Sequence, residues 1–188
     1  MKSILITGAT GFIGQELAQK LNAIHFESVA TINFVFERKN VLHPLNGFGF
    51  VVPAAEKRSL IGCSFSHQKF EGRVLNAEHV LLRAFVGGAY GRDIFKKADA
   101  EMTAAILDDL KNILGISSAP LQTLLRRYPQ GMPQYEVGHL ERVREIFDTA
   151  ANERGLFLTG NSYLGIGIPD CVRHAKETAE QIGKWVMD

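Results

Sequence analysis

The first 22 residues combine a short apolar run with a helical apolar spacing. Ile4-Leu5-Ile6 is followed at once by glycine-rich sequence, and Ile13, Leu17 and Leu21 then recur every four residues. A run that glycines end predicts a strand and a tight loop, and the later spacing predicts one face of a helix. Residues 1–22 are therefore expected to form a strand–loop–helix unit.

The next stretch, up to about residue 90, has a β pattern. β-branched and aromatic side chains dominate four runs, and glycine or proline separates them. The runs are residues 29–36, 48–52, 60–65 and 80–86. Because connections this short leave no room for crossover helices, the pattern predicts a mostly antiparallel sheet.

Helical spacing returns after the sheet. Met102, Ile106 and Leu110 lie on one face of a predicted helix. Asp99 stands where an N-cap is expected, and Gly115 is a natural C-terminal stop. This helix has an apolar stripe that can pack on the sheet.

The last third predicts four further elements. A strand is expected over residues 121–127 and a helix around residues 140–150. Residues 156–158 predict a short buried strand, residues 160–169 a glycine-bearing loop, and the apolar spacing of residues 172–186 a closing helix. Together the elements predict an α+β fold, with a mostly antiparallel sheet, packed helices and a terminal strand–loop–helix unit.

Composition and charge exclude several classes of function. Hydrophobic residues make up 46% of the chain, and 21 basic residues nearly balance 20 acidic ones, so no field for nucleic acid is expected. Cys63 and Cys171 lack ligand spacing, so neither a disulfide nor a metal site is predicted. No apolar run is long enough for a transmembrane helix. We therefore expect a cytoplasmic protein, with peripheral attachment to a membrane left open.

A first glycine motif lies near the N-terminus. Gly8, Gly11 and Gly14 have the order of a loop that approaches a pyrophosphate, and Glu37 falls in the window of a ribose-binding acid. This motif resembles the start of NAD-dependent epimerases and other extended short-chain dehydrogenases. However, the chain has no Tyr-x-x-x-Lys pair, and the alternation of strands and helices stops after one unit. The alternative is a strand–helix unit whose glycines only allow close packing.

A second glycine motif is the loop over residues 160–171. Its glycines allow backbone to approach a ligand, and the helix that follows begins with a partial positive charge. Such an end would stabilise the negative charge of a reduced flavin. The alternative is a glycine-adapted turn in which Asp170 satisfies the first helical turn by itself. The residues alone leave this choice open.

From about residue 16 onward, several stretches together resemble the C-terminal third of the oxygen-dependent protoporphyrinogen and coproporphyrinogen oxidases. They occur in the order of that family. They are Phe26-Glu27-Ser28-Val29-Ala30, His43-Pro44-Leu45-Asn46-Gly47-Phe48-Gly49-Phe50-Val51-Val52-Pro53 with Glu56, Phe70-Glu71-Gly72-Arg73, Phe85-Val86-Gly87-Gly88, Pro133-Gln134-Tyr135-Glu136-Val137-Gly138-His139 and residues 160–171. These flavoenzymes have the monoamine oxidase type of fold, so the resemblance implies part of an FAD-binding amine oxidase fold.

The resemblance implies a role for each part of the chain. Residues 23–130 would form a substrate-side sheet and helix that help enclose a porphyrinogen, residues 131–188 a segment that contacts FAD, and residues 1–22 the epimerase-like unit. The implied cofactor contacts are Gly165, Ile166, Gly167 and Ile168, with Arg127 and Tyr128 near the cofactor. Phe85 is the implied substrate contact, and simple core packing is its alternative.

The resemblance stops near Gly14, where the family's own dinucleotide-binding region does not appear. The leading interpretation is therefore part of an FAD-dependent oxidoreductase of porphyrin biosynthesis, expected to be incomplete and inactive by itself. No catalytic residue is identified, because the flavin supplies the chemistry. Two alternatives stay open, a non-catalytic module that binds porphyrin or a partner, and a remnant of an NAD-binding dehydrogenase.

Overall fold

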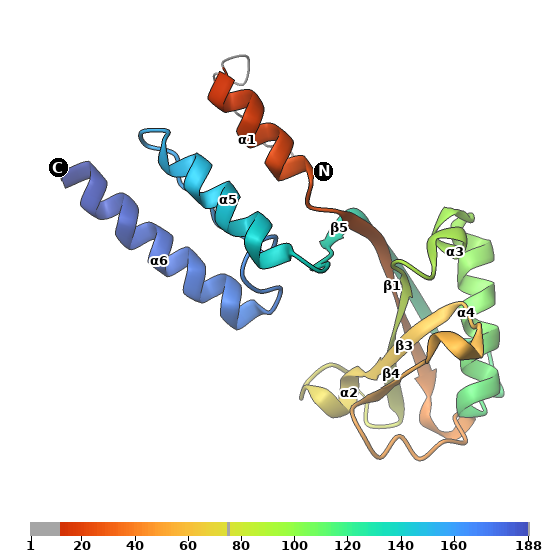
Figure 1. Cartoon of the computed structure of the whole chain (residues 1–188). Coiled ribbons are helices and arrows are strands. Elements are labelled where there is room, and N and C mark those ends of the chain that lie inside the picture. Colours follow the sequence, from red (N-terminus) through yellow and green to blue (C-terminus); the bar gives the residue numbers. More distant parts are fainter. Residues whose placement is uncertain (1–11, 75, 188) are drawn as a thin grey trace. The chain divides into compact units, whose positions relative to one another are not determined.

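The structure is a computed structural model that describes residues 12–74 and 76–187 (Figure 1). It divides the chain into two compact units. One unit, here the sheet unit, is Glu27–Met132, and the other, the helical unit, joins the chain up to Phe26 with the chain from Pro133 onward. Each unit is described by itself.

The sheet unit is built on five strands in the order β2-β3-β4-β1-β5. They are β1 (Phe26–Glu37), β2 (Gly49–Val51), β3 (Leu60–Phe65), β4 (His79–Gly87) and β5 (Gln122–Pro133). The pairs β1–β4, β2–β3 and β3–β4 are antiparallel. This confirms the predicted antiparallel sheet, although β5 continues beyond the predicted strand 121–127.

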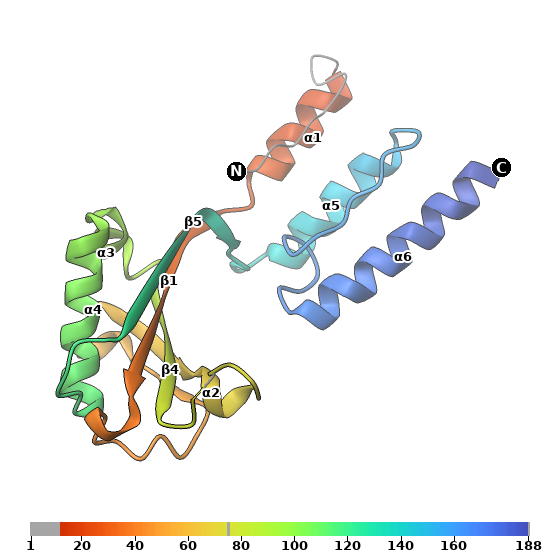
Figure 2. The ribbon, with the colours of Figure 1, turned by 180° about the vertical axis from the view of Figure 1, so that it is seen from behind.

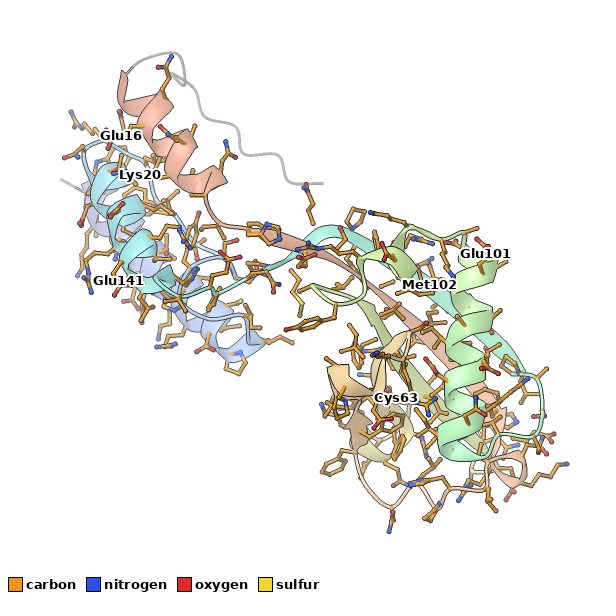
Figure 3. The ribbon with its side chains drawn as sticks, turned by 45° about the vertical axis from the view of Figure 1, so that its right-hand side comes forward. Glu16, Lys20, Cys63, Glu101, Met102 and Glu141 are labelled. Atoms are coloured by element: carbon orange, nitrogen blue, oxygen red, sulfur yellow. The ribbon has the colours of Figure 1, made fainter. Side chains whose placement is uncertain are left out.

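One face of the sheet is covered by α4 (Asp99–Leu114), as both views of the ribbon show (Figures 1 and 2). Alternate residues of β1, such as Ile32 and Phe34, point to this face and are fully buried. Met102 of α4 and Cys63 of β3 belong to the same core (Figure 3). Each large apolar side chain buried here contributes about 1.5–3 kcal/mol, so the stripe on α4 holds the helix to the sheet.

The ends of α4 differ from the sequence-based expectation at one of the two predicted residues. Asp99 is the first helical residue and not the N-cap; the preceding Ala98 has no side-chain oxygen to cap with. Instead the Ala98 N–H donates to the Glu101 carboxylate at 3.2 Å. Gly115 is confirmed as the stop, because its φ of 63° is left-handed and its N–H donates to Lys111 O at 2.9 Å.

Short elements complete the sheet unit. They are the helices α2 (Ser66–Lys69) and α3 (Arg92–Lys96) and the 3₁₀ helices Arg38–Asn40 and Ala54–Glu56. Near the start of β1, the buried carboxylate of Glu27 accepts hydrogen bonds from the guanidinium of Arg92 on α3. A buried carboxylate is tolerated here because it has this cationic partner.

The helical unit contains α1 (Phe12–Asn22), α5 (His139–Ala151) and α6 (Ile168–Met187). Helices α1 and α5 pack together around a small core that includes Leu17 and Ile146. Lys20 of α1, labelled with Glu16 in Figure 3, donates to Thr149 Oγ1 of α5 at 2.8 Å. Gly14 lies in α1, whereas Gly8 and Gly11 of the first glycine motif lie outside the described residues, so nothing here tests that motif.

One prediction for the last third needs correction, and another is confirmed. The expected strand at residues 156–158 is wrong, because this half-buried segment pairs with no strand in the described part of the chain. The closing helix is confirmed as α6, which contains no buried residue; Val172 and Val186 of its apolar stripe are mostly exposed. Across residues 12–74 and 76–187, no helix is long and apolar enough to span a membrane.

Candidate functional site

Tyr135 holds the loop that precedes α6. Its hydroxyl donates to the backbone oxygen of Asn161 and accepts a hydrogen bond from the Gly165 N–H, both at 2.9 Å. One side chain therefore bridges two points of the loop. Burial raises the pKa of the Tyr135 phenol, so the hydroxyl keeps the proton that it donates.

His139, at the start of α5, supports Tyr135 and contacts the same loop. The two rings stack with centroids 3.9 Å apart and an interplanar angle of 14°. Nε2 of the buried imidazole lies 2.8 Å from the backbone oxygen of Tyr163. Because a carbonyl only accepts hydrogen bonds, Nε2 must carry a proton. Sequence reasoning missed this pair as functional; the only signal was its place in the stretch 133–139 that resembles the oxidases.

The packing of the loop explains why position 165 is a glycine, without any ligand. The φ of Gly165 is +158°, and a Cβ atom there would lie 2.5 Å from the Cβ atom of Asp170. Asp170 itself pairs with Arg173 at 2.6 Å. At Gly167 a Cβ atom would lie 3.2 Å from Asp170 Oδ2, a tight contact with the end of a side chain. Gly165 is therefore required by the packing of the loop, and Gly167 much less so.

Residues 160–168, here called the flavin loop, carry exposed apolar side chains. Leu164, Ile166 and Ile168 expose 45%, 54% and 80% of their surface. The start of α6 carries a partial positive charge that attracts an anion, although Pro169 there has no N–H to donate. A reduced flavin ring has an apolar part and an edge that carries negative charge, and the loop offers apolar side chains beside a partial positive charge. The residues present therefore fit the cofactor.

A second candidate site is a cavity of about 710 Å³ on the face of the sheet opposite α4, here called the open face. Phe85 of β4 lines it and is 40% exposed, so it is not a core residue. The other side chains at its walls include Phe48, Val51, Ile61 and Met132. Among the residues that the structure describes, no Asp, Glu, Lys, Arg or His lines this cavity. Such a lining suits a broad apolar molecule.

Glycines at the floor explain why the open face is hollow. Gly62 stands opposite Phe85 in the ladder, and Gly49 stands opposite Ser64. A Cβ atom would lie 2.8 Å from Phe50 O at Gly62 and 2.2 Å from Cys63 O at Gly49. Because these positions cannot carry a side chain without moving the neighbouring strand, no side chain fills the space.

Arg127 and Tyr128 lie on β5 in the sheet unit. The Arg127 guanidinium donates to Lys97 O at 2.7 Å, to Phe95 O, and to Asp99 Oδ1 at 2.8 Å. These bonds join β5 to the connection between α3 and α4, which is a structural role. Tyr128 is about half exposed.

The structure thus places Gly165, Ile166, Gly167 and Ile168 in the helical unit, and Arg127, Tyr128 and Phe85 in the sheet unit. In the described ranges no group of His, Cys, Asp or Glu side chains could hold a metal ion.

The chain is similar to known flavoenzymes over most of its length. The sequence profile of the family described as flavin containing amine oxidoreductase matches residues 1–183. The coproporphyrinogen III oxidase of Bacillus subtilis is 31% identical over 180 residues, which cover 93% of this chain and 38% of the relative. Protoporphyrinogen oxidase 1 of the Arabidopsis thaliana chloroplast is 28% identical over 188 residues, which cover 93% of this chain and 34% of the relative.

A solved structure shows the same similarity in three dimensions. A crystal structure assigned as a protoporphyrinogen oxidase from Exiguobacterium is 32% identical and superposes with a TM-score of 0.78. The match covers 90% of this chain and 37% of that one. The chain therefore spans between a third and two fifths of the length of these three relatives.

Proposed function

The chain belongs to the family of flavin containing amine oxidoreductases, and on that premise we propose that it forms the substrate side and a flavin-contacting loop of an FAD-dependent porphyrinogen oxidase. The cavity on the open face carries the proposal. Its volume of about 710 Å³ and its apolar, uncharged lining suit a reduced porphyrin macrocycle, with Phe85 against the ring. The relatives named above are porphyrinogen oxidases, which supports this substrate class.

The flavin loop is the proposed cofactor contact. Backbone groups of Ile166, Gly167 and Ile168 would hold one edge of the flavin, and Gly165 shapes the loop through its packing on Asp170. Arg127 and Tyr128 are the proposed second region near the cofactor. FAD, when bound, supplies the electron acceptor for oxidation of the macrocycle and passes the electrons to oxygen. The protein's own contribution is to position the ring and the substrate.

Porphyrin binding by the purified chain tests the substrate side. We expect Phe85→Ala to weaken the binding of coproporphyrin III about tenfold, because a buried aromatic contact is worth about 1.5–3 kcal/mol. The shift of the porphyrin Soret band on binding measures the affinity. Phe70→Ala is the matched control, since Phe70 is 46% exposed in the same unit but does not line the cavity. Equal affinities for the two variants and the wild type would contradict the proposal.

A second candidate function is porphyrin binding without turnover. The observation that favours it is that every residue lining the cavity belongs to the sheet unit, whereas the flavin loop belongs to the helical unit. A Soret band without flavin absorbance in the purified protein would support binding alone. A flavin spectrum that porphyrinogen bleaches in the absence of oxygen would support the oxidase.

A further inference from the structure

Arg83 lies beside the cavity on the open face of the sheet. It precedes Phe85 by two residues on β4, so both side chains point to the same face. Its neighbours across the ladder are Asn33 on β1 and Ser64 on β3, and Ser64 lines the cavity. A cation therefore stands at the edge of a cavity whose own lining is uncharged.

The guanidinium of Arg83 is held in place and still has free donors. Its Nε–H donates to Asn33 Oδ1 at 2.9 Å, and the side chain is exposed. In the part of the chain that the structure describes, the side chain of Arg83 makes no other hydrogen bond and no ion pair. Because Nε is the donor used, both terminal NH₂ groups remain available to grip a carboxylate side by side.

Neighbouring carboxylates do not neutralise this charge. The two acidic residues of β1 already have partners, since Glu27 pairs with Arg92 and Glu37 pairs with Lys39 at 3.0 Å. Strand β4 itself contains no acidic residue. Other arginines of the sheet unit are engaged differently: Arg58 pairs with Asp109, and Arg127 binds backbone oxygens and Asp99. Arg83 is therefore an oriented cation that lacks an anion.

We propose that Arg83 binds a propionate carboxylate of the macrocycle that occupies the open-face cavity. This inference rests on the proposed function and adds to it the residue that distinguishes a free carboxylate from its ester. A porphyrinogen is an apolar ring with carboxylates at its rim, and the open face presents an apolar hollow with a fixed cation beside it. Asn33 is a positioning residue, because it orients the guanidinium and does not reach the ligand in this role.

The test compares coproporphyrin III with its methyl ester as ligands of the purified chain. We expect Arg83→Gln to weaken binding of the free acid about fivefold and to leave binding of the ester unchanged, because an exposed bidentate pair is worth about 1 kcal/mol. Arg144→Gln is the matched control: it removes the same charge from an exposed position on α5 and should change neither ligand. Arg83→Lys keeps the charge without the planar fork and should restore only part of the loss.

The outcomes separate this inference from the proposed function. If Phe85→Ala weakens the binding of both ligands while Arg83→Gln leaves the ratio of acid to ester affinity unchanged, the role of Arg83 is overturned. The proposal that the cavity binds the macrocycle is then retained. If Phe85→Ala changes the affinity for neither ligand, the cavity does not bind the macrocycle and the proposed function is wrong. Circular dichroism of each variant confirms that the sheet is retained. A fall in the salt dependence of acid binding in Arg83→Gln would support the ion pair.

Discussion

Gly165 and Gly167 stand two residues apart, yet the structure gives them different constraints. Gly165 has the unusual φ and the close Asp170 side chain, whereas Gly167 meets only the end of that side chain. We expect Gly165→Ala to lower the free energy of unfolding by about 1–3 kcal/mol, and Gly167→Ala by less than about 1 kcal/mol. Urea unfolding of the two variants measures the difference. Equal losses would show that the Asp170 contact does not explain Gly165.

Cys63 is expected to make the protein less stable at alkaline pH. Burial raises the pKa of its thiol from 9.0 to about 12. Above pH 9 the thiol of the unfolded chain ionises while the folded one keeps its proton, so stability falls as pH rises toward 12, by at most about 1.4 kcal/mol per pH unit. Urea unfolding at pH 8 and pH 10 should therefore show a smaller loss in Cys63→Ala than in the wild type.

The control for this prediction is the other thiol. Cys171 is only partly buried, so Cys171→Ala removes a thiol without removing a buried one. Identical slopes for Cys63→Ala and the wild type would contradict the assignment. Because alanine at position 63 also removes a buried side chain, only the change with pH is compared, not the absolute stability.

At the scale of elements, one carboxylate links the helix α4 to the sheet. Asp109 is 9% exposed, accepts the Leu60 N–H at 3.0 Å and pairs with Arg58 at 3.2 Å. Its loss would leave a buried N–H at the start of β3 without a partner. We expect Asp109→Ala to lower the free energy of unfolding by about 2–3 kcal/mol.

Asp108→Ala is the matched control, since Asp108 is exposed on the same helix and accepts a hydrogen bond from Asn112 of that helix at 3.3 Å. Its expected effect is within about 0.5 kcal/mol. Thermal unfolding of both variants measures the contrast. A loss at Asp108 as large as that at Asp109 would mean that helix propensity, and not the link to β3, determines the effect.

At the scale of the whole molecule, the flavin contacts proposed for this chain are few. The proposed contact of the flavin loop is with one edge of a large cofactor. The chain covers 38% of the Bacillus subtilis relative and 37% of the Exiguobacterium structure. Affinity depends on how much of a ligand is buried after the costs of ordering are met. We therefore expect the purified 188-residue chain to retain no FAD and to show no more than trace porphyrinogen oxidation.

Two measurements check this expectation. Absorbance at about 450 nm, a general property of oxidised flavins, reports bound FAD, and porphyrin fluorescence reports product. After gel filtration has removed free flavin, denaturing the protein should release none. Stoichiometric FAD with steady turnover would show that the contacts in this chain suffice.

The β-rich runs and the short connections between them by themselves determined the antiparallel sheet. Alternation along a strand determined which of its residues are buried, as Ile32 and Phe34 show on β1. The stripe on α4 and the stop at Gly115 were local signals of the same kind. The resemblance singled out the flavin loop and Phe85 as candidates. These features are encoded by neighbours in the chain.

Only the tertiary structure decided which partners these elements find. Residues 156–158 read as a strand, but a strand exists through hydrogen bonds to another strand, and the described residues offer none. The hollow above Gly62 and the free donors of Arg83 depend on which strands are adjacent, which no local pattern specifies. Tyr135 and His139 likewise became recognisable only when folding brought them to the flavin loop. Pattern determines which face a residue occupies, whereas function here depends on long-range pairing.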